Sequence, residues 1–247
     1  MAKERLDKLL ARKGFGSRKD VKKLLRQQEV FINKIRVFDS SFQVDVQKDE
    51  VFFNGEKISF EENYYLMMNK KAGYVCSSKD GEHSTVFDLL EDDLRTPYLQ
   101  EKLHIVGRLD LDTEGLLLFT TDGELTHRLI SPKSHIDKTY YCSLEHNETS
   151  ESQAEITKRF ENGIEVPAEG NEDAFTAQNA KIKWIDEKTA LLTIFEGKYH
   201  QVKRMFSAVG NKVIYLKRIS IGQLKLDEAL KPGEYRSLSE EELDLLN

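Results

Sequence analysis

The chain is organised around Gly107-Arg108-Leu109-Asp110-Leu111-Asp112-Thr113-Glu114-Gly115, a polar segment that leads directly into the apolar residues 116–119. Three carboxylates and one arginine lie within seven residues, and the apolar run after them is predicted to be a buried strand. Reactive side chains often lie on a loop that a rigid strand holds in place. The stretch therefore predicts a catalytic loop, and the simpler alternative is a solvated acidic turn between two strands.

The composition indicates a globular protein of more than one part. The chain has 247 residues, four prolines and 32% charged residues, which allows one domain of ordinary size and a smaller one. No apolar run is long enough to span a membrane, and the first 20 residues lack the apolar core of a secretory signal. We therefore expect a cytoplasmic protein that begins at this methionine. We expect its two cysteines, Cys76 and Cys142, to be thiols that serve in packing.

The net charge of −6 conceals a strong asymmetry along the chain. Residues 1–36 contain twelve Lys or Arg and four Asp or Glu, a local charge of +8, which leaves −14 on the remainder. A concentrated basic segment is typical of a surface that binds nucleic-acid phosphates.

The basic segment is predicted to contain two short helices. Apolar residues recur at helical spacing on both sides of a break at Gly14–Gly16, and Ser17 with Asp20 can cap the second helix. Short strands are predicted after it, with a turn at Asn54–Gly55. The second helix separates an apolar face from a basic one. The basic face contains Lys19, Lys22, Lys23 and Arg26.

The rest of the chain alternates predicted strands with helices, which indicates an α+β fold. Residues 59–63 have the polarity of a linker, so we expect domains at 1–60 and 61–247. The strand at 64–70 ends in a basic turn that suits a rim facing an anionic ligand. Further strands are expected at 138–144, 181–184 and 190–195, and an amphipathic helix at 149–162. A capped last helix is expected after Ser239.

Several of these segments together resemble one enzyme family. GRLDLDTEGLLLFTTDGELTHRL, Lys138-Thr139-Tyr140 and the segment from Gln201 to Arg204 are similar to three motifs of the pseudouridine synthases, in particular the RsuA-type branch that modifies ribosomal RNA at single sites. The first 60 residues resemble the alpha-L RNA-binding domain of ribosomal protein S4. The resemblance implies a small S4-like domain followed by a catalytic domain with a mixed, mainly antiparallel sheet.

The resemblance also implies roles for individual residues. Asp110 corresponds to the catalytic aspartate, Tyr140 to a tyrosine that stacks on uracil, and Lys203 to the basic residue that pairs with the aspartate. Lys203 falls at the edge of the apolar face formed by residues 202, 205, 206 and 209, where a cation can reach a partly buried carboxylate. Arg108 is expected to enter the RNA stack when the target base flips out. We expect Arg204 and His200 to face solvent or RNA.

The implied reaction is the isomerisation of one uridine in 16S rRNA to pseudouridine, of the type that acts at position 516. The sequence has no dinucleotide fingerprint, P-loop or metal-ligand cluster, so we expect no cofactor and no metal. The expected partner is 16S rRNA or a small-subunit assembly intermediate, bound by a monomer that contacts no membrane.

Three alternatives remain open from the residues. The same reaction could have a target in 23S rRNA, or the basic helices could serve a noncatalytic ribosome-assembly factor. A glycosidase could use Asp110 and Asp112 as a carboxylate pair, but in an extended segment residues i and i+2 point to opposite faces. That pairing requires the loop to fold back.

Overall fold

The computed structural model describes residues 3–46, 48–58 and 63–246. It divides into two compact units, one formed by residues up to 64 together with 90–103, the other by 65–89 together with 104 onward. The linker expected at residues 59–63 lies, except for Asn63, outside the described residues. Within the described chain, no helix combines the length and apolar character needed to cross a bilayer.

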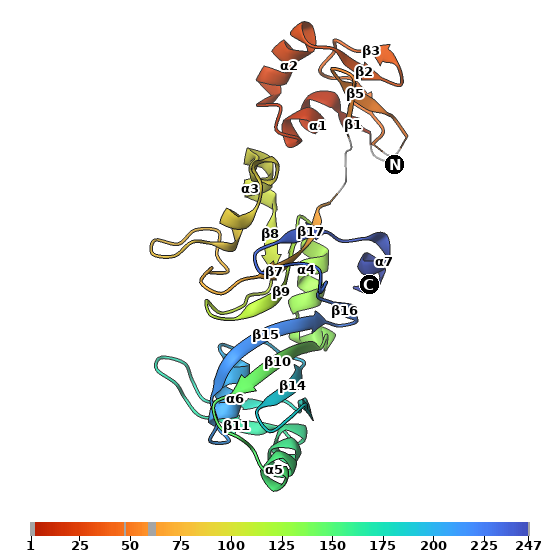
Figure 1. Cartoon of the computed structure of the whole chain (residues 1–247). Helices are drawn as coiled ribbons and strands as arrows, with labels where there is room; N and C mark the ends of the chain where they lie inside the picture. The colour runs from red at the N-terminus through yellow and green to blue at the C-terminus, as the bar shows by residue number, and fades with distance from the viewer. Residues whose placement is uncertain (1–2, 47, 59–62, 247) are drawn as a thin grey trace. The chain divides into compact units, whose positions relative to one another are not determined.

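The first unit packs two helices on small sheets (Figure 1). Its helices α1 and α2 pack through leucines and valines that are almost completely buried, and these include Leu9 and Leu25. Ser17 and Asp20 form the expected capping box of α2. Residues 90–103 add a short 3-10 helix and α3 to this unit. The elements are β1 (Glu4–Arg5), α1 (Leu6–Arg12), α2 (Arg18–Gln27), β2 (Val30–Ile32), β3 (Ile35–Arg36), β4 (Gln43–Val44), β5 (Val51–Phe53), β6 (Glu56–Ile58), η2 (Asp92–Arg95) and α3 (Pro97–Lys102).

The second unit is built on one nine-stranded sheet in the order β13-β14-β10-β15-β9-β7-β17, with β16 paired to β15 and β8 to β9. Of these pairings only β15 with β9 is parallel. The strands are β7 (Tyr65–Lys70), β8 (His104–Val106), β9 (Glu114–Thr120), β10 (Lys138–Leu144), β13 (Lys181–Trp184), β14 (Thr189–Ile194), β15 (Val213–Ile221), β16 (Leu224–Lys225) and β17 (Tyr235–Ser237).

Helices and a separate hairpin complete this unit. Helix α4 is capped by Asp122, and its Leu125 and Leu129 join the core beneath β9. Ser239 and Glu242 form a capping box on the last helix. These elements are η1 (Val86–Leu89), α4 (Gly123–Ile130), η3 (Pro132–Ser134), α5 (Ser150–Glu161), β11 (Ile164–Val166), β12 (Phe175–Ala177), α6 (Gln201–Ser207) and α7 (Glu240–Asp244).

The parallel pairing of β9 with β15 depends on Gly115. Its φ is +100°, and a Cβ atom built there would lie 2.2 Å from the carbonyl oxygen of Arg218. Only glycine permits that approach. The motif glycine therefore fixes β9 against β15 immediately after the predicted catalytic loop.

The expected α+β architecture is confirmed: a small helical and stranded N-terminal unit precedes a mainly antiparallel sheet. Strands and helices occur where the pattern placed them, with small shifts at their ends. The expectation had assigned residues 90–103 to the second domain, whereas they pack with the first unit.

Candidate active site

The predicted catalytic loop joins β8 to β9 and is turned, not extended. The amide of Thr113 donates to the carbonyl of Asp110 at 3.1 Å, and the amide of Leu109 donates to Cys76 Sγ at 3.3 Å. The amide of Gly73 reaches the carbonyl of Leu111 at 2.8 Å. Backbone contacts along the loop therefore fix the direction of the Asp110 side chain.

Lys70, the last residue of β7, holds the same loop through its ammonium group. The side chain is completely buried, and Nζ donates to the carbonyls of Thr113 at 2.7 Å, Asp110 at 3.0 Å and Leu111 at 3.3 Å. Burial lowers the pKa of Lys70 below its ordinary value, against nearby groups that include the Asp110 and Asp112 carboxyls. We had expected the basic turn that ends this strand to face an anionic ligand. That expectation is wrong for Lys70, because the loop covers its side chain.

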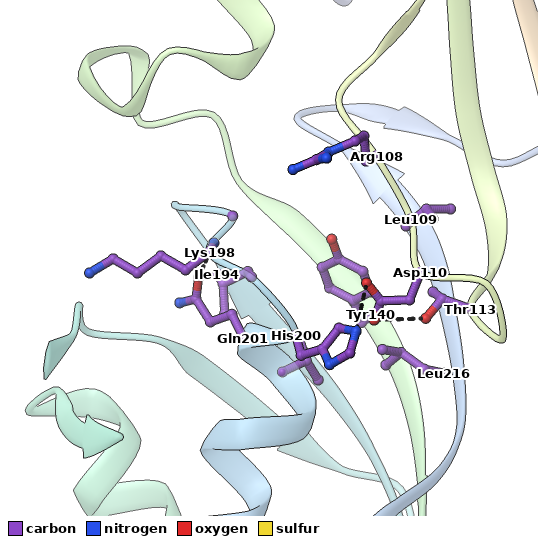
Figure 2. Close-up of a pocket in the computed structure, with 12 residues that line it drawn as sticks. Arg108, Leu109, Asp110, Thr113, Tyr140, Ile194, Lys198, His200, Gln201 and Leu216 are labelled. Atoms are coloured by element: carbon purple, nitrogen blue, oxygen red, sulfur yellow. Dashed lines mark hydrogen bonds and ion pairs between the residues drawn. The ribbon is translucent and has the colours of Figure 1, made fainter. Parts of the chain in front are cut away.

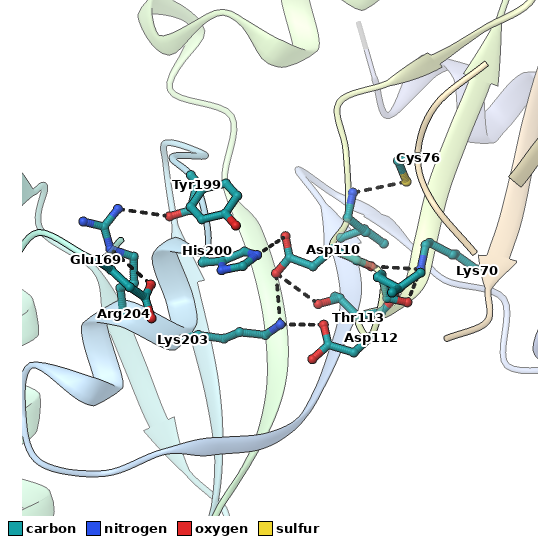
Figure 3. Close-up of polar contacts among 12 residues, drawn as sticks. Lys70, Cys76, Asp110, Asp112, Thr113, Glu169, Tyr199, His200, Lys203 and Arg204 are labelled. Carbon is teal, nitrogen blue, oxygen red and sulfur yellow. Dashed lines mark hydrogen bonds and ion pairs between the residues drawn. The ribbon is translucent and has the colours of Figure 1, made fainter. Parts of the chain in front are cut away.

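Asp110 carries the expected ion pair with Lys203 (Figure 3). Lys203 Nζ, on α6, lies 3.2 Å from Asp110 Oδ2, and the two side chains are only 23% and 28% exposed. The hydroxyl of Thr113 donates to the same carboxylate oxygen at 3.4 Å. Asp110 is thus a half-buried carboxylate with a cation and a hydroxyl directed at it.

Asp112 shares the same ammonium, which the sequence did not indicate. Its Oδ1 lies 2.6 Å from Lys203 Nζ, because the turn at residues 110–113 brings both carboxylates to one side. Burial alone would raise the pKa of Asp112 and lower that of Lys203. Their mutual hydrogen bond and charges outweigh burial, so the pKa of Asp112 lies below and that of Lys203 above its ordinary value.

His200 also lies beside Asp110. Its Nε2 is 3.7 Å from Asp110 Oδ1, and its ring stacks on Tyr199 with centroids 3.8 Å apart. His200 takes left-handed backbone angles, with φ of 47°, just before α6 begins. That turn aims the ring at the loop. We had expected His200 to face solvent or RNA. A lone histidine in the sequence does not indicate that it will lie beside Asp110.

Tyr140 and Asp110 line one pocket (Figure 2). The tyrosine is 7% exposed on β10, whereas Tyr141 points to the other face and packs against Tyr215. The pocket measures about 70 Å³ and is bounded by the loop, by β10 and by the start of α6. A planar ring and an ionisable carboxylate therefore face one small space. Its other lining residues are Arg108, Leu109, Thr113, Ile194, Gly197, Lys198, His200, Gln201, Val202 and Leu216.

The remaining basic residues divide into exposed and buried ones. Arg108 is exposed at the pocket rim, and the basic residues of α2 in the first unit, Lys19, Lys22, Lys23 and Arg26, are all exposed.

Arg204 differs from the expectation that it would face solvent or RNA, because its side chain is only 5% exposed. Its Nη2 donates to the carbonyls of Pro167 and Asp173 at 2.8 Å, and its guanidinium lies 4.8 Å from the centre of the Phe175 ring. The segment joining β11 to β12 covers this side of α6. Arg204 therefore anchors that segment. A helical pattern in a single sequence does not indicate which loop will cover the helix.

Comparisons with known proteins give one consistent result. Residues 64–208 match the RNA pseudouridylate synthase family, and residues 4–51 match the S4 domain. An RNA pseudouridine synthase of Bacillus subtilis strain 168, named YtzG and described as uncharacterised, is 47% identical over 98% of both chains. A protein of Haemophilus influenzae named ribosomal small subunit pseudouridine synthase A is 41% identical over 98% of this chain and 99% of its own. A pseudouridylate synthase crystal structure is 40% identical, with a TM-score of 0.65 over 99% of this chain and 100% of that one. This chain is therefore a member of the RNA pseudouridylate synthase family, with an S4 domain ahead of its catalytic domain.

Proposed function

We propose that this protein isomerises a single uridine in 16S rRNA, of the position 516 type, to pseudouridine. The observation that carries the proposal is the ion pair between Lys203 and Asp110, 3.2 Å apart in the pocket that Tyr140 lines. The choice of RNA is supported by relatives named ribosomal small subunit pseudouridine synthase A, such as those of Haemophilus influenzae and Vibrio cholerae.

The reaction breaks the N1–C1′ bond, turns the uracil and joins its C5 to C1′; C5 then loses its proton and N1 takes one up, so that the product is an isomer of the substrate. Asp110 is the reacting carboxylate, either as a nucleophile at C1′ or as the base that removes a ribose proton. Both roles require the ionised form. Lys203 supports that form with a charge-assisted contact, and Thr113 adds a hydrogen bond to the same oxygen.

Tyr140 stacks on the uracil ring and takes the C5 proton or positions a water molecule that does. The target base leaves the RNA stack to reach Asp110, which costs about a few kcal/mol. Arg108 enters the vacated position, in keeping with its exposure at the pocket rim. His200, beside Asp110, contacts the bound nucleotide.

In this proposal residues 1–60 form the RNA-docking domain and 61–247 the catalytic domain, from which residues 90–103 depart to pack with the first unit. The exposed basic face of α2 contacts phosphates and recognises RNA by its shape, which offsets the cost of base flipping. Free 16S rRNA or a small-subunit assembly intermediate is the substrate, met in the cytoplasm by a monomer.

Pseudouridine mapping in both rRNAs from a deletion strain tests the target. We expect one site to disappear from 16S rRNA and to return when the gene is restored. Loss of a 23S site instead would move the substrate to the large subunit. No change in either rRNA would leave only RNA binding, as in an assembly factor.

A further inference from the structure

A second cavity adjoins the Asp110 pocket, and Tyr140 lines both. It measures about 420 Å³ and shares Arg108, Tyr140, Gly197 and Lys198 with the smaller pocket. Several of its lining residues have no role in the proposed reaction. Two of them, Lys138 and Arg218, are cations on neighbouring strands β10 and β15.

Arg218 is buried and incompletely bonded. It is 2% exposed, and its Nε donates to the carbonyl of Leu116 at 2.8 Å. Its Nη2 is also buried, yet has no hydrogen-bond partner among the described residues. A buried guanidinium nitrogen without an acceptor is costly, so a ligand that supplies an acceptor is favoured there.

Lys138 adds a second positive charge to the same cavity. Among the described residues, the one hydrogen-bond acceptor of its Nζ is the backbone carbonyl of Ile136, at 3.1 Å. Burial lowers the pKa of Lys138 and the nearby charge of Arg218 lowers it further, while the neighbouring Asp137 carboxylate opposes this shift. Like charges held together in a half-buried cavity favour an anion between them.

The one carboxylate that lines the cavity, among the residues described, is engaged elsewhere. Glu196 Oε1 accepts from the amide of Gln178 at 2.8 Å and from Gln201 Nε2 at 2.7 Å. No ion pair within 4 Å joins Glu196 to Lys138 or Arg218 in the described chain. The cavity therefore keeps an excess of positive charge.

We propose that Lys138 and Arg218 bind a backbone phosphate next to the uridine that occupies the Asp110 pocket. The inference rests on the proposed function for the identity of that uridine. A phosphate oxygen gives Arg218 Nη2 the acceptor it lacks and separates the two like charges. Because Tyr140 lines both spaces, a phosphate in the second cavity lies next to a uracil ring stacked on this tyrosine. This contact holds the sugar-phosphate part still while the detached uracil turns.

Binding of small probes to the full-length protein tests this site. Calorimetry measures the affinities of uridine, uridine 5′-monophosphate, uridine 3′-monophosphate and inorganic phosphate. The two monophosphates distinguish a phosphate on the 5′ side of the uridine from one on the 3′ side. We expect one monophosphate to bind about tenfold more tightly than uridine. In Lys138→Met that preference falls to about twofold or less, while uridine affinity is unchanged.

Two further variants make the result specific. Arg218→Lys keeps the charge but loses the second guanidinium nitrogen, so we expect it to lose most of the same preference. Lys183→Met removes an exposed charge from β13 of the same sheet and is expected to bind all four probes as the wild type does. Thermal unfolding establishes that each variant is folded, and the variant that folds carries the test.

Equal affinity of the wild type for uridine and both monophosphates would overturn the proposal. The proposal would also be overturned if Lys138→Met weakened the binding of uridine as much as that of the monophosphate, because the cavity would then receive the base. These outcomes do not depend on which rRNA is modified. Failure of the mapping experiment with an intact phosphate preference would reject the target and leave the phosphate site.

Discussion

Two lysines hold the same loop in chemically different ways (Figure 3). Lys203 is partly exposed and pairs with two carboxylates, whereas Lys70 is completely buried and bonds to backbone carbonyls. The pKa of Lys203 lies above its ordinary value and that of Lys70 below it. One lysine therefore determines the charge presented to the ligand, and the other determines the shape of the loop.

The difference implies that the two contacts fail separately. Removing the charge of Lys203 leaves the loop backbone in place, because Lys70 and the turn at residues 110–113 do not depend on it. Removing the Lys70 ammonium leaves Lys203 and Asp110 able to pair. It removes the hydrogen bonds to the carbonyls that hold the loop backbone. The variants below separate these effects, by activity and by free energy of unfolding.

The largest effect is expected from Asp110→Asn. The amide cannot serve as nucleophile or base, so we expect turnover to fall by at least about 10⁴-fold. Tritium release from RNA labelled at uridine C5 measures it. Lys70 bonds to the carbonyl of residue 110, not to its side chain, so the free energy of unfolding is expected to change by less than about 1 kcal/mol. Equal tritium release by wild type and variant would remove Asp110 from its role.

Lys203→Met is expected to reduce kcat by about 10²- to 10³-fold, because two adjacent carboxylates then share no ammonium. Lys203→Arg supplies a cation of different shape and is expected to recover part of the loss. Single-turnover kinetics on saturating RNA measure the chemical step. An unchanged rate in the methionine variant would show that Asp110 acts without a cation.

Lys70→Met keeps the length of the side chain but removes the donor. The carbonyls of Asp110, Leu111 and Thr113 lose a buried partner, so we expect the free energy of unfolding to fall by about 2–4 kcal/mol. Because the loop then loosens, kcat of the folded variant is expected to fall about tenfold. Urea denaturation and tritium release measure the two.

The matched control is Lys71→Met, which changes the next residue, an exposed lysine. It is expected to leave both quantities within the error of the wild type. If the two variants behaved alike, the carbonyl contacts of Lys70 would not support the loop.

The pairing of Lys203 with Asp110 was predicted from the sequence, whereas the contacts of Lys70 were not, and the reason is physical. The resemblance to the pseudouridine synthases implied the pairing of Lys203, and the apolar face of α6 leaves this side chain at the edge of the core, within reach of a carboxylate. Lys70 stands in a run with Lys71, and nothing in a single sequence tells a lysine that bonds to carbonyls from one that faces solvent. That distinction arises only when residues 110–113 fold over β7.

Arg204 and Asp112 were missed for the same kind of reason. The burial of Arg204 depends on the segment between β11 and β12, which lies more than 30 residues earlier in the chain. The convergence of Asp110 and Asp112 depends on a turn that the alternating pattern of the loop did not indicate. Periodicity predicts which face of an element is buried, but not which distant segment covers it.

Asp112→Asn gives the smallest effect and a test by pH. Because the pKa of Asp112 is lowered in the folded state, its contribution to stability is present above its ordinary pKa of 3.8 and is lost as the pH falls through the lowered value. The side chain is 72% exposed, so we expect the variant to lose less than about 1 kcal/mol at pH 7. As the pH falls from 3.8 through the lowered pKa, the difference in urea midpoint between the two proteins should shrink, since the wild-type carboxyl is then becoming protonated. Lys203 stays protonated over this whole interval because its pKa is raised. A stability difference that did not shrink on acidification would mean that Asp112 shapes the loop through contacts other than its charge.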